Sequence, residues 1–214
     1  MAQLFTDRIE AGRVLAEQVA ALSLHDAVVL ALPRGGVPVA AEIAWRLHAP
    51  LDLLIVRKIG LPWHPELAVA AVVDAQPPVV VVDQQTMASM GVELSYVEER
   101  AREEEAEIAR RRALYLGGRA AVPLVGRTVV VVDDGIATGT TVRAALKALR
   151  TRHPARLVLA VPVAAPSSAE ALKEEVDDLV CLAQPPEFMA VGAYYHDFHQ
   201  VSDEEVIAVL AQLA

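Results

Sequence analysis

Two adjacent acids, Asp133 and Asp134, stand between a run of four valines and a turn of small residues in the stretch VVVVDDGIATGTT, residues 129–141. The turn offers N–H and hydroxyl donors, and the helix expected from about Thr140 adds its N-terminal partial charge, so the turn suits a phosphate. Carboxylates repel phosphate and need a donor-rich or cationic partner. A pentose 5-phosphate satisfies both halves, because its phosphate binds the turn and its hydroxyls donate to the acids. The alternative is a strand–turn–helix corner whose acids only cap the helix.

Two further stretches carry cations where ligands could bind. Arg34, Gly35 and Gly36 lie in LALPRGGVPVAAEIA, residues 30–44, ahead of a helix expected from Pro38. Glycines allow close backbone approach, and an arginine fork binds phosphate oxygens. Arg57 and Lys58 lie in LLIVRKIGLPWHPEL, residues 53–67. The plain alternatives are a tight turn with a solvated arginine, and a strand end with exposed charges.

These residues need elements that bring them together, and the chain alternates apolar, β-branched segments with helical ones. Runs such as VVVV indicate strands buried on both faces, hence a parallel sheet covered by helices. Ligands bind beyond the carboxyl ends of such strands. The predicted fold class is therefore α/β, a parallel twisted sheet flanked by helices. The expected strands are Ala27–Leu32, Leu51–Val56, Val79–Val82, Thr128–Val132, Leu157–Val161 and Leu179–Leu182.

A long helix is expected over Ser95–Leu116, with acids early and the three arginines 110–112 late. This order complements the helix dipole, and Glu107 with Arg111 forms an i,i+4 pair. We expect the arginines to form a solvated face, with phosphate binding as the alternative. Capping-box spacing marks four helix starts. These pairs are Asp7 with Glu10, Ser95 with Glu98, Ser167 with Glu170, and Ser202 with Glu205.

Length and composition predict one domain over residues 1–214, since 214 residues at 54% hydrophobic content can bury a sizeable core. A net charge of −9 disfavours nucleic acid as a partner. No apolar run reaches the ~20 residues that span a membrane. The start of the chain is charged, unlike a signal peptide, and Cys181 is the single cysteine. We therefore expect a cytoplasmic protein.

The stretch VVVVDDGIATGTT resembles the signature of type I phosphoribosyltransferases, and the chain looks most like a poorly characterised bacterial branch of that family. The resemblance implies that Asp133 and Asp134 hold the ribose hydroxyls of phosphoribosyl pyrophosphate (PRPP). Residues 34–36 resemble the pyrophosphate loop, in which a non-proline cis peptide would fall at Pro33–Arg34. The turn that would wrap the 5-phosphate consists of Ala137, Thr138, Gly139, Thr140 and Thr141.

The family's reaction joins a nitrogenous base to C1 of PRPP and expels pyrophosphate. Arg34, Arg57 and Lys58 would neutralise that leaving group, and Mg²⁺ would bind chiefly through the oxygens of PRPP, with no protein ligand assigned. Leu61 stands where orotate and adenine phosphoribosyltransferases usually carry a further lysine. Ala137 stands where enzymes for 6-oxopurines carry an acidic proton acceptor, which argues against a hypoxanthine or guanine substrate.

The resemblance places a base-selecting hood in the C-terminal segment, residues 184–214. Aromatic faces stack on flat heterocycles. The candidate base-binding residues are therefore Phe188, Tyr194, Tyr195 and Phe198, with Ile136 as an apolar floor. These rings could instead pack the C-terminal helix or a dimer interface, with the hood at Trp63–Glu66. We expect a homo-oligomer, a dimer.

Two rival classes of function stay open. A non-catalytic PRPP-binding regulator would keep the same site, although no basic segment for DNA is evident. A phosphatase or isomerase on a similar α/β scaffold fits the three loops poorly. Release of pyrophosphate from PRPP distinguishes an enzyme from a regulator.

Overall fold

The computed structural model describes residues 3–75 and 77–213, without the side chains of Pro65 and Glu66. Its centre is a five-stranded sheet in the order β2-β1-β6-β7-β8, with every neighbouring pair parallel. This confirms the α/β fold. The strands are β1 (Ala27–Ala31), β2 (Leu51–Leu53), β6 (Thr128–Val132), β7 (Arg156–Val163) and β8 (Asp178–Ala183).

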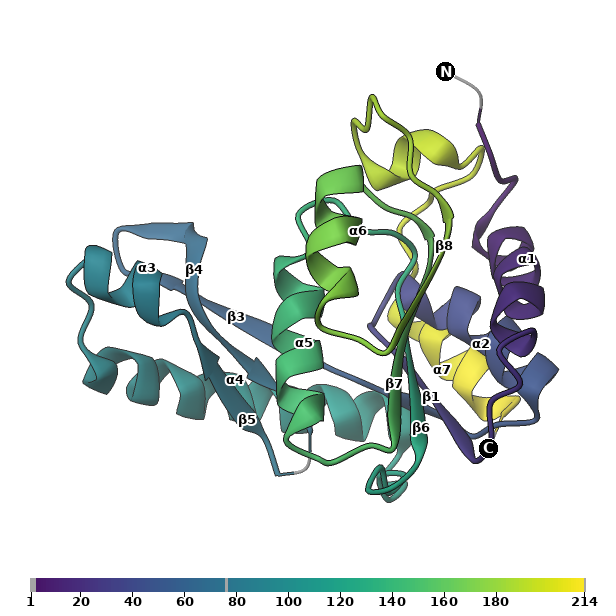
Figure 1. Ribbon diagram of the computed structural model, residues 1–214. Helices are drawn as coiled ribbons and strands as arrows, with labels where there is room; N and C mark the ends of the chain where they lie inside the picture. The colour runs from purple at the N-terminus through teal and green to yellow at the C-terminus, as the bar shows by residue number, and fades with distance from the viewer. Residues whose placement is uncertain (1–2, 76, 214) are drawn as a thin grey trace.

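Helices cover both faces of this sheet (Figure 1). Alternate residues of each strand point to opposite faces. Val29 and Val130 therefore belong to one core cluster, and Val28 and Val129 to the other. The first cluster includes α1 (Arg8–Ala20), α2 (Gly36–Leu47) and α7 (Asp203–Ala211), and the second includes α5 (Thr140–Arg150) and α6 (Pro166–Lys173).

A second, three-stranded antiparallel sheet projects beside the parallel one (Figure 1). It consists of β3 (Val56–Leu61), β4 (His64–Val73) and β5 (Val79–Val82), followed by α3 (Gln84–Ser89). The prediction of one strand over Leu51–Val56 was wrong, because β2 ends at Leu53. Val79–Val82 is a strand, but it pairs antiparallel with β4. Unlike β6, it is not buried on both faces.

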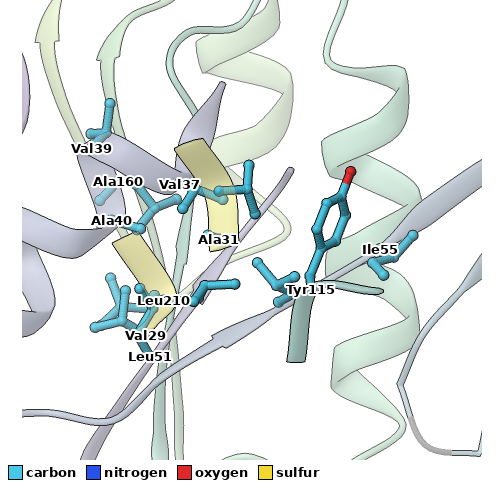
Figure 2. Close-up of a cluster of buried hydrophobic side chains, with 14 of the residues drawn as sticks. Val29, Ala31, Val37, Val39, Ala40, Leu51, Ile55, Tyr115, Ala160 and Leu210 are labelled. Carbon is cyan, nitrogen blue, oxygen red and sulfur yellow. The ribbon is translucent and has the colours of Figure 1, made fainter. Parts of the chain in front are cut away.

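The long helix α4 (Leu94–Leu116) packs its C-terminal part against the core. Figure 2 shows Tyr115 of α4 among buried side chains from β1, α2 and α7. Glu107 and Arg111 form the expected pair at 2.7 Å. Arg112 departs from the expected solvated face. Its guanidinium lies 3.0 Å from Asp52 Oδ2 and 2.8 Å from Asp74 Oδ2, between carboxylates that are 4% and 3% exposed.

Two of the four expected caps are formed. Asp7 accepts from the N–H of Glu10, and Ser202 with Glu205 forms a complete capping box. The other two were wrong, because α4 begins at Leu94 after Glu93 and α6 begins at Pro166 after Ala165. Each expected serine is therefore already inside its helix.

The C-terminal segment assigned to the hood divides into two parts. Residues 184–199, with the 3₁₀ helix η1 (Val191–Tyr194), lie beyond the strand ends beside the N-terminal segment (Figure 1). The N–H of Phe5 donates to Tyr194 O at 3.1 Å, and the N–H of His196 donates to Phe5 O at 2.9 Å. The remainder forms α7, which packs against α2 and α4.

Candidate active site

The loop after β1 and the acids after β6 meet at one edge of the sheet. Ala31 pairs with Val132, and the N–H of Leu32 donates to Val132 O at 2.9 Å. A Cβ built on Gly35 would lie 2.0 Å from Asp134 Oδ2, and one on Gly36 would lie 2.7 Å from Val132 O. Only glycine permits this approach, so the loop of residues 33–36 and the acid pair form one site. The Pro33–Arg34 peptide is cis, where the resemblance placed it.

The turn of residues 137–141 leads directly into α5. Gly139 has φ +71° and precedes the first helical residue, Thr140. The hydroxyls of Thr138 and Thr140 lie 3.4 Å apart, and both residues are exposed. Ser168 of α6 fixes the start of the turn, because its hydroxyl donates to Ala137 O at 2.5 Å. Such a helix start leaves N–H groups without partners inside the helix, and here they lie beside the exposed hydroxyls of Thr138 and Thr140.

Burial raises the pKa of both acids above the ordinary aspartate value. For Asp133 the pKa is well above 3.8, because of burial first and then the charge of Asp134. For Asp134 burial also raises the pKa, and Arg8 partly offsets it. The N–H of Asp134 donates to Asp133 Oδ1 at 2.9 Å, and among the described residues Asp133 has no ion-pair partner. Asp133 therefore has no direct counter-ion in the described part of the chain when it is ionised, although the charge of Arg8 lowers its pKa in part.

Arg8 is a site residue that the sequence analysis missed. Its Nε donates to Asp134 Oδ2 at 2.8 Å, its Nη1 donates to His199 O at 2.9 Å, and its guanidinium lies 3.9 Å from the centre of the Phe198 ring. Only 7% of the residue is exposed. Arg8 lies 126 positions from Asp134 in the first turn of α1, and nothing in the sequence connects them.

Replacing Arg8 by Met is expected to make the binding of PRPP, the ligand that the sequence resemblance implies, more sensitive to acid. Arg8 lowers the pKa of Asp134, so its loss raises that pKa and the carboxylate is protonated at a higher pH. Calorimetric titration of PRPP over a series of pH values should show that the loss of binding at the acidic end begins at a higher pH in the variant. Arg13→Met is the matched control, because Arg13 is 70% exposed and pairs only with Glu42 among the described residues. If PRPP binding by the two variants depends on pH in the same way, Arg8 does not keep Asp134 ionised for binding.

Arg57 and Lys58, which were predicted to act together, point to opposite faces of the antiparallel sheet. Both residues lie on β3, where successive side chains point in opposite directions. Arg57 Nε donates to Glu104 of α4 at 2.7 Å. Lys58 lines a pocket of about 520 Å³ that also contains Thr138, Thr140, Arg143 and Lys147. The structure therefore places Lys58, on strand β3, with the 137–141 turn and not with Arg57.

The predicted base-binding residues have different surroundings. Tyr194 and Tyr195 are 3% and 2% exposed, and Tyr195 donates its hydroxyl to Asp134 O at 2.6 Å. Phe198 lines a pocket of about 350 Å³ together with Arg8, Arg34, Gly35 and Asp134. Phe188 is half-buried and its ring centre lies 5.5 Å from that of Tyr194.

Two other base-site predictions fall elsewhere in the fold. Ile136 is 2% exposed and bridges to Ala164, so its side chain lies in the core under the turn and not on the open side of the site. The alternative hood at Trp63–Glu66 covers the end of the turn between β3 and β4 and the first residues of β4, and Trp63 is 64% exposed. The side chains of Pro65 and Glu66 are outside the described residues.

In this parallel sheet the acid pair lies between the loop of residues 33–36 and the turn of residues 137–141. Residues 5–199 match the family of the phosphoribosyl transferase domain. The chain therefore belongs to this family, in its type I branch. None of the helices in the described part of the chain combines the length and apolar character that crossing a membrane takes.

Individual relatives agree with this membership. A Mycobacterium tuberculosis protein named "Putative phosphoribosyl transferase MT0597" is 44% identical over 208 residues, 97% of this chain and 46% of its own length. The chain thus spans about half of this relative. The solved structure of TT1426 from Thermus thermophilus is 43% identical, with a TM-score of 0.87 over 100% of both chains. A hypoxanthine phosphoribosyltransferase from Staphylococcus aureus, 12% identical, covers 87% of this chain and 78% of its own at TM-score 0.50, and shows the fold alone.

Proposed function

We propose that the chain transfers the phosphoribosyl group of PRPP to a nitrogenous base and releases pyrophosphate. The observation that supports this most directly is the placement of Asp133 and Asp134 between two anion-binding corners. The loop of residues 33–36 touches Asp134, and the turn of residues 137–141 follows the acids and ends at the N-terminus of α5. A pentose with phosphate at one end and diphosphate at the other matches this order of charges.

In the proposed reaction, the bond from C1 to the pyrophosphate oxygen breaks and its electrons leave with pyrophosphate. A lone pair of the base nitrogen forms the new bond to C1, and the proton that this nitrogen loses goes to water, because Ala137 offers no carboxylate. Asp133 and Asp134 stabilise the positive charge on the ribosyl ring. Catalysis on this scheme is positioning and electrostatic stabilisation.

The two ends of PRPP are assigned to different cations. At the 5-phosphate end Lys58 faces the pocket shared with Thr138 and Thr140. At the diphosphate end Arg34 is exposed to the pocket that contains Asp134. Arg57 stays in the proposal for the leaving group, and it must first separate from Glu104, with which it is paired.

The acid pair also fits the Mg²⁺ that accompanies PRPP. Carboxylate oxygens are the ligands that Mg²⁺ prefers, and it usually keeps several waters. Asp133 has no ion-pair partner among the described residues, so its carboxylate would hold the hydrated cation when PRPP is bound. Bound Mg²⁺ would neutralise charge that accumulates on pyrophosphate as it departs.

The deciding experiment is release of pyrophosphate from PRPP across a panel of bases. We expect turnover with at least one base, dependence on Mg²⁺, and weaker PRPP binding at high salt, since exposed charges are screened. PRPP that binds tightly without turnover on any base identifies a non-catalytic regulator. If PRPP binds with equal affinity in Mg²⁺ and in excess chelator, the proposed dependence on Mg²⁺ is wrong. The proposal extends to a dimer, which sedimentation measures independently.

A further inference from the structure

A second pocket adjoins the loop of residues 33–36, on the side of α4. It has a volume of about 210 Å³ and is lined by Pro33, Arg34, Arg110, Arg111, Leu114, Tyr115 and Asp203. Arg34 is shared with the pocket that contains Asp134. The consecutive arginines of α4, predicted as a solvated face, therefore reach the loop that resembles a pyrophosphate site.

A carboxylate of the chain itself occupies this cationic pocket. Asp203 Oδ1 lies 3.4 Å from Arg34 Nη1 and accepts the hydroxyl of Tyr115 at 2.6 Å. The hydrogen bond from Tyr115, followed by the hydrogen bond and charge of Arg34, lowers the pKa of Asp203, so it is an anion at neutral pH. The structure thus shows an oxyanion held where an external oxyanion could bind.

The arginines keep donors available for a ligand. Arg111 uses Nε to bind Glu107, at 2.7 Å, and no protein bond to its Nη atoms is present among the described residues. Arg110 contacts the same carboxylate through Nε and Nη2. A guanidinium has five N–H donors, so both residues can bind phosphate oxygens while they remain held by Glu107.

Strand β3 contributes no cation to the pocket beside the loop of residues 33–36, according to the residues that line it in the described part of the chain. Leu61, where related enzymes usually carry lysine, is buried at 2% exposure. Lys58 faces the 137–141 turn, and Arg57 is paired with Glu104. Among the described residues, the guanidinium groups that line this pocket are those of Arg34, Arg110 and Arg111.

We infer that Arg110 and Arg111, together with Arg34, bind the diphosphate of the substrate, and that Asp203 is an internal counter-ion that the diphosphate displaces. This inference rests on the proposed function and assigns residues of α4 and α7 to it. Removing the arginines must weaken diphosphate binding, and removing the charge of Asp203 must strengthen it. A purely structural role for these ion pairs predicts no such opposite signs.

The test is calorimetric binding of two probes, inorganic pyrophosphate with Mg²⁺ and ribose 5-phosphate. The variant with both Arg110→Gln and Arg111→Gln should bind pyrophosphate at least about 10-fold more weakly, since charge-assisted bonds are the strong ones. Asp203→Asn, which keeps an acceptor for Tyr115, should bind it several-fold more tightly. Ribose 5-phosphate, which lacks the diphosphate, should bind all variants within about twofold of wild type. Arg100→Gln is the matched control, because Arg100 forms a comparable pair with Glu103 nearer the N-terminus of α4.

The outcomes separate this inference from the proposed function. Pyrophosphate affinity within twofold of wild type in the double arginine variant overturns the inference, as does weaker binding by Asp203→Asn. Loss of ribose 5-phosphate affinity in the arginine variant also overturns it, because the effect is then not confined to the diphosphate end. Failure of the wild-type protein to bind ribose 5-phosphate and PRPP at all overturns the proposed function instead.

Discussion

Asp133→Asn is expected to lower turnover on the order of 100-fold and, at the same time, to raise the melting temperature at neutral pH. The loss of one contact to the cationic ribosyl ring costs on the order of 3 kcal/mol in the transition state. The fold should survive, because asparagine keeps the oxygen that accepts the N–H of Asp134. Pyrophosphate release from PRPP measures the first effect and thermal unfolding the second.

The gain in stability follows from the direction of the pKa shift. The pKa of Asp133 in the folded protein is well above its ordinary value of 3.8, so the ionised carboxyl is less favourable folded than unfolded. The contribution of the Asp133 carboxyl to the free energy of unfolding therefore falls as the pH rises from about 3.8 to its pKa in the folded protein. Asparagine does not ionise, so the advantage of the variant should be largest above the folded pKa and vanish near about pH 4.

Asp177→Asn is the control of opposite sign. Its hydrogen bond from Arg150 lowers the pKa of Asp177, so the ionised form stabilises the fold above that pKa and the substitution should lower the melting temperature at neutral pH. Turnover by Asp133→Asn within a few-fold of wild type removes Asp133 from the catalytic machinery. If the melting temperature falls in both variants, the ionised carboxyl of Asp133 does not destabilise the folded protein, and this part of the prediction is wrong.

Arg112→Met is expected to be the most destabilising substitution among the arginines of α4. It removes the cation between Asp52 and Asp74, which are 4% and 3% exposed, and leaves both carboxylates buried. Breaking a buried ion pair on one side costs about 3–5 kcal/mol. For a chain of this size the melting temperature should fall by at least about 6 °C.

Arg100→Met is the comparison on the same helix. Arg100 is 43% exposed and pairs with Glu103, so its replacement should change the free energy of unfolding by less than about 0.5 kcal/mol. Urea denaturation of both variants gives the two free energies directly. Equal values would mean that Arg112 is no more than a surface charge.

The parallel sheet, the acid pair with its turn, and the loop of residues 33–36 could be predicted because their signals are local. Four valines before an acid pair indicate a buried strand, and a Gly-Thr turn indicates the start of α5. The loop of residues 33–36 was predictable for the same reason, since a glycine pair ahead of a helix is a local signal for a tight strand-to-helix turn. Parallel strand ends then bring these local features together, without any further information from the sequence.

The features that escaped prediction depend on contacts between distant segments. The stretch HPELAVAAVV did not indicate a strand, because β4 gains its stability from pairing with both β3 and β5. Lys58 was assigned to the leaving group because adjacent cations look equivalent in a sequence, whereas a strand turns them to opposite faces. Arg8 and Arg112 look like ordinary helical arginines, and only the tertiary structure shows the buried carboxylates beside them.

Hydrogen bonds join residues 184–199 to Asp134 and to the N-terminal segment, so residues 184–199 cannot be exchanged alone. Tyr195 donates to Asp134 O, and Arg8 joins Asp134 to His199 O, while Phe5 pairs with Tyr194 and His196. A chimaera that exchanges only residues 184–199 between relatives would sever this connection and misplace an acid of the site. Moving residues 184–199 between relatives without disturbing Asp134 therefore requires moving residues 4–8 with them, although the two segments lie far apart in the sequence.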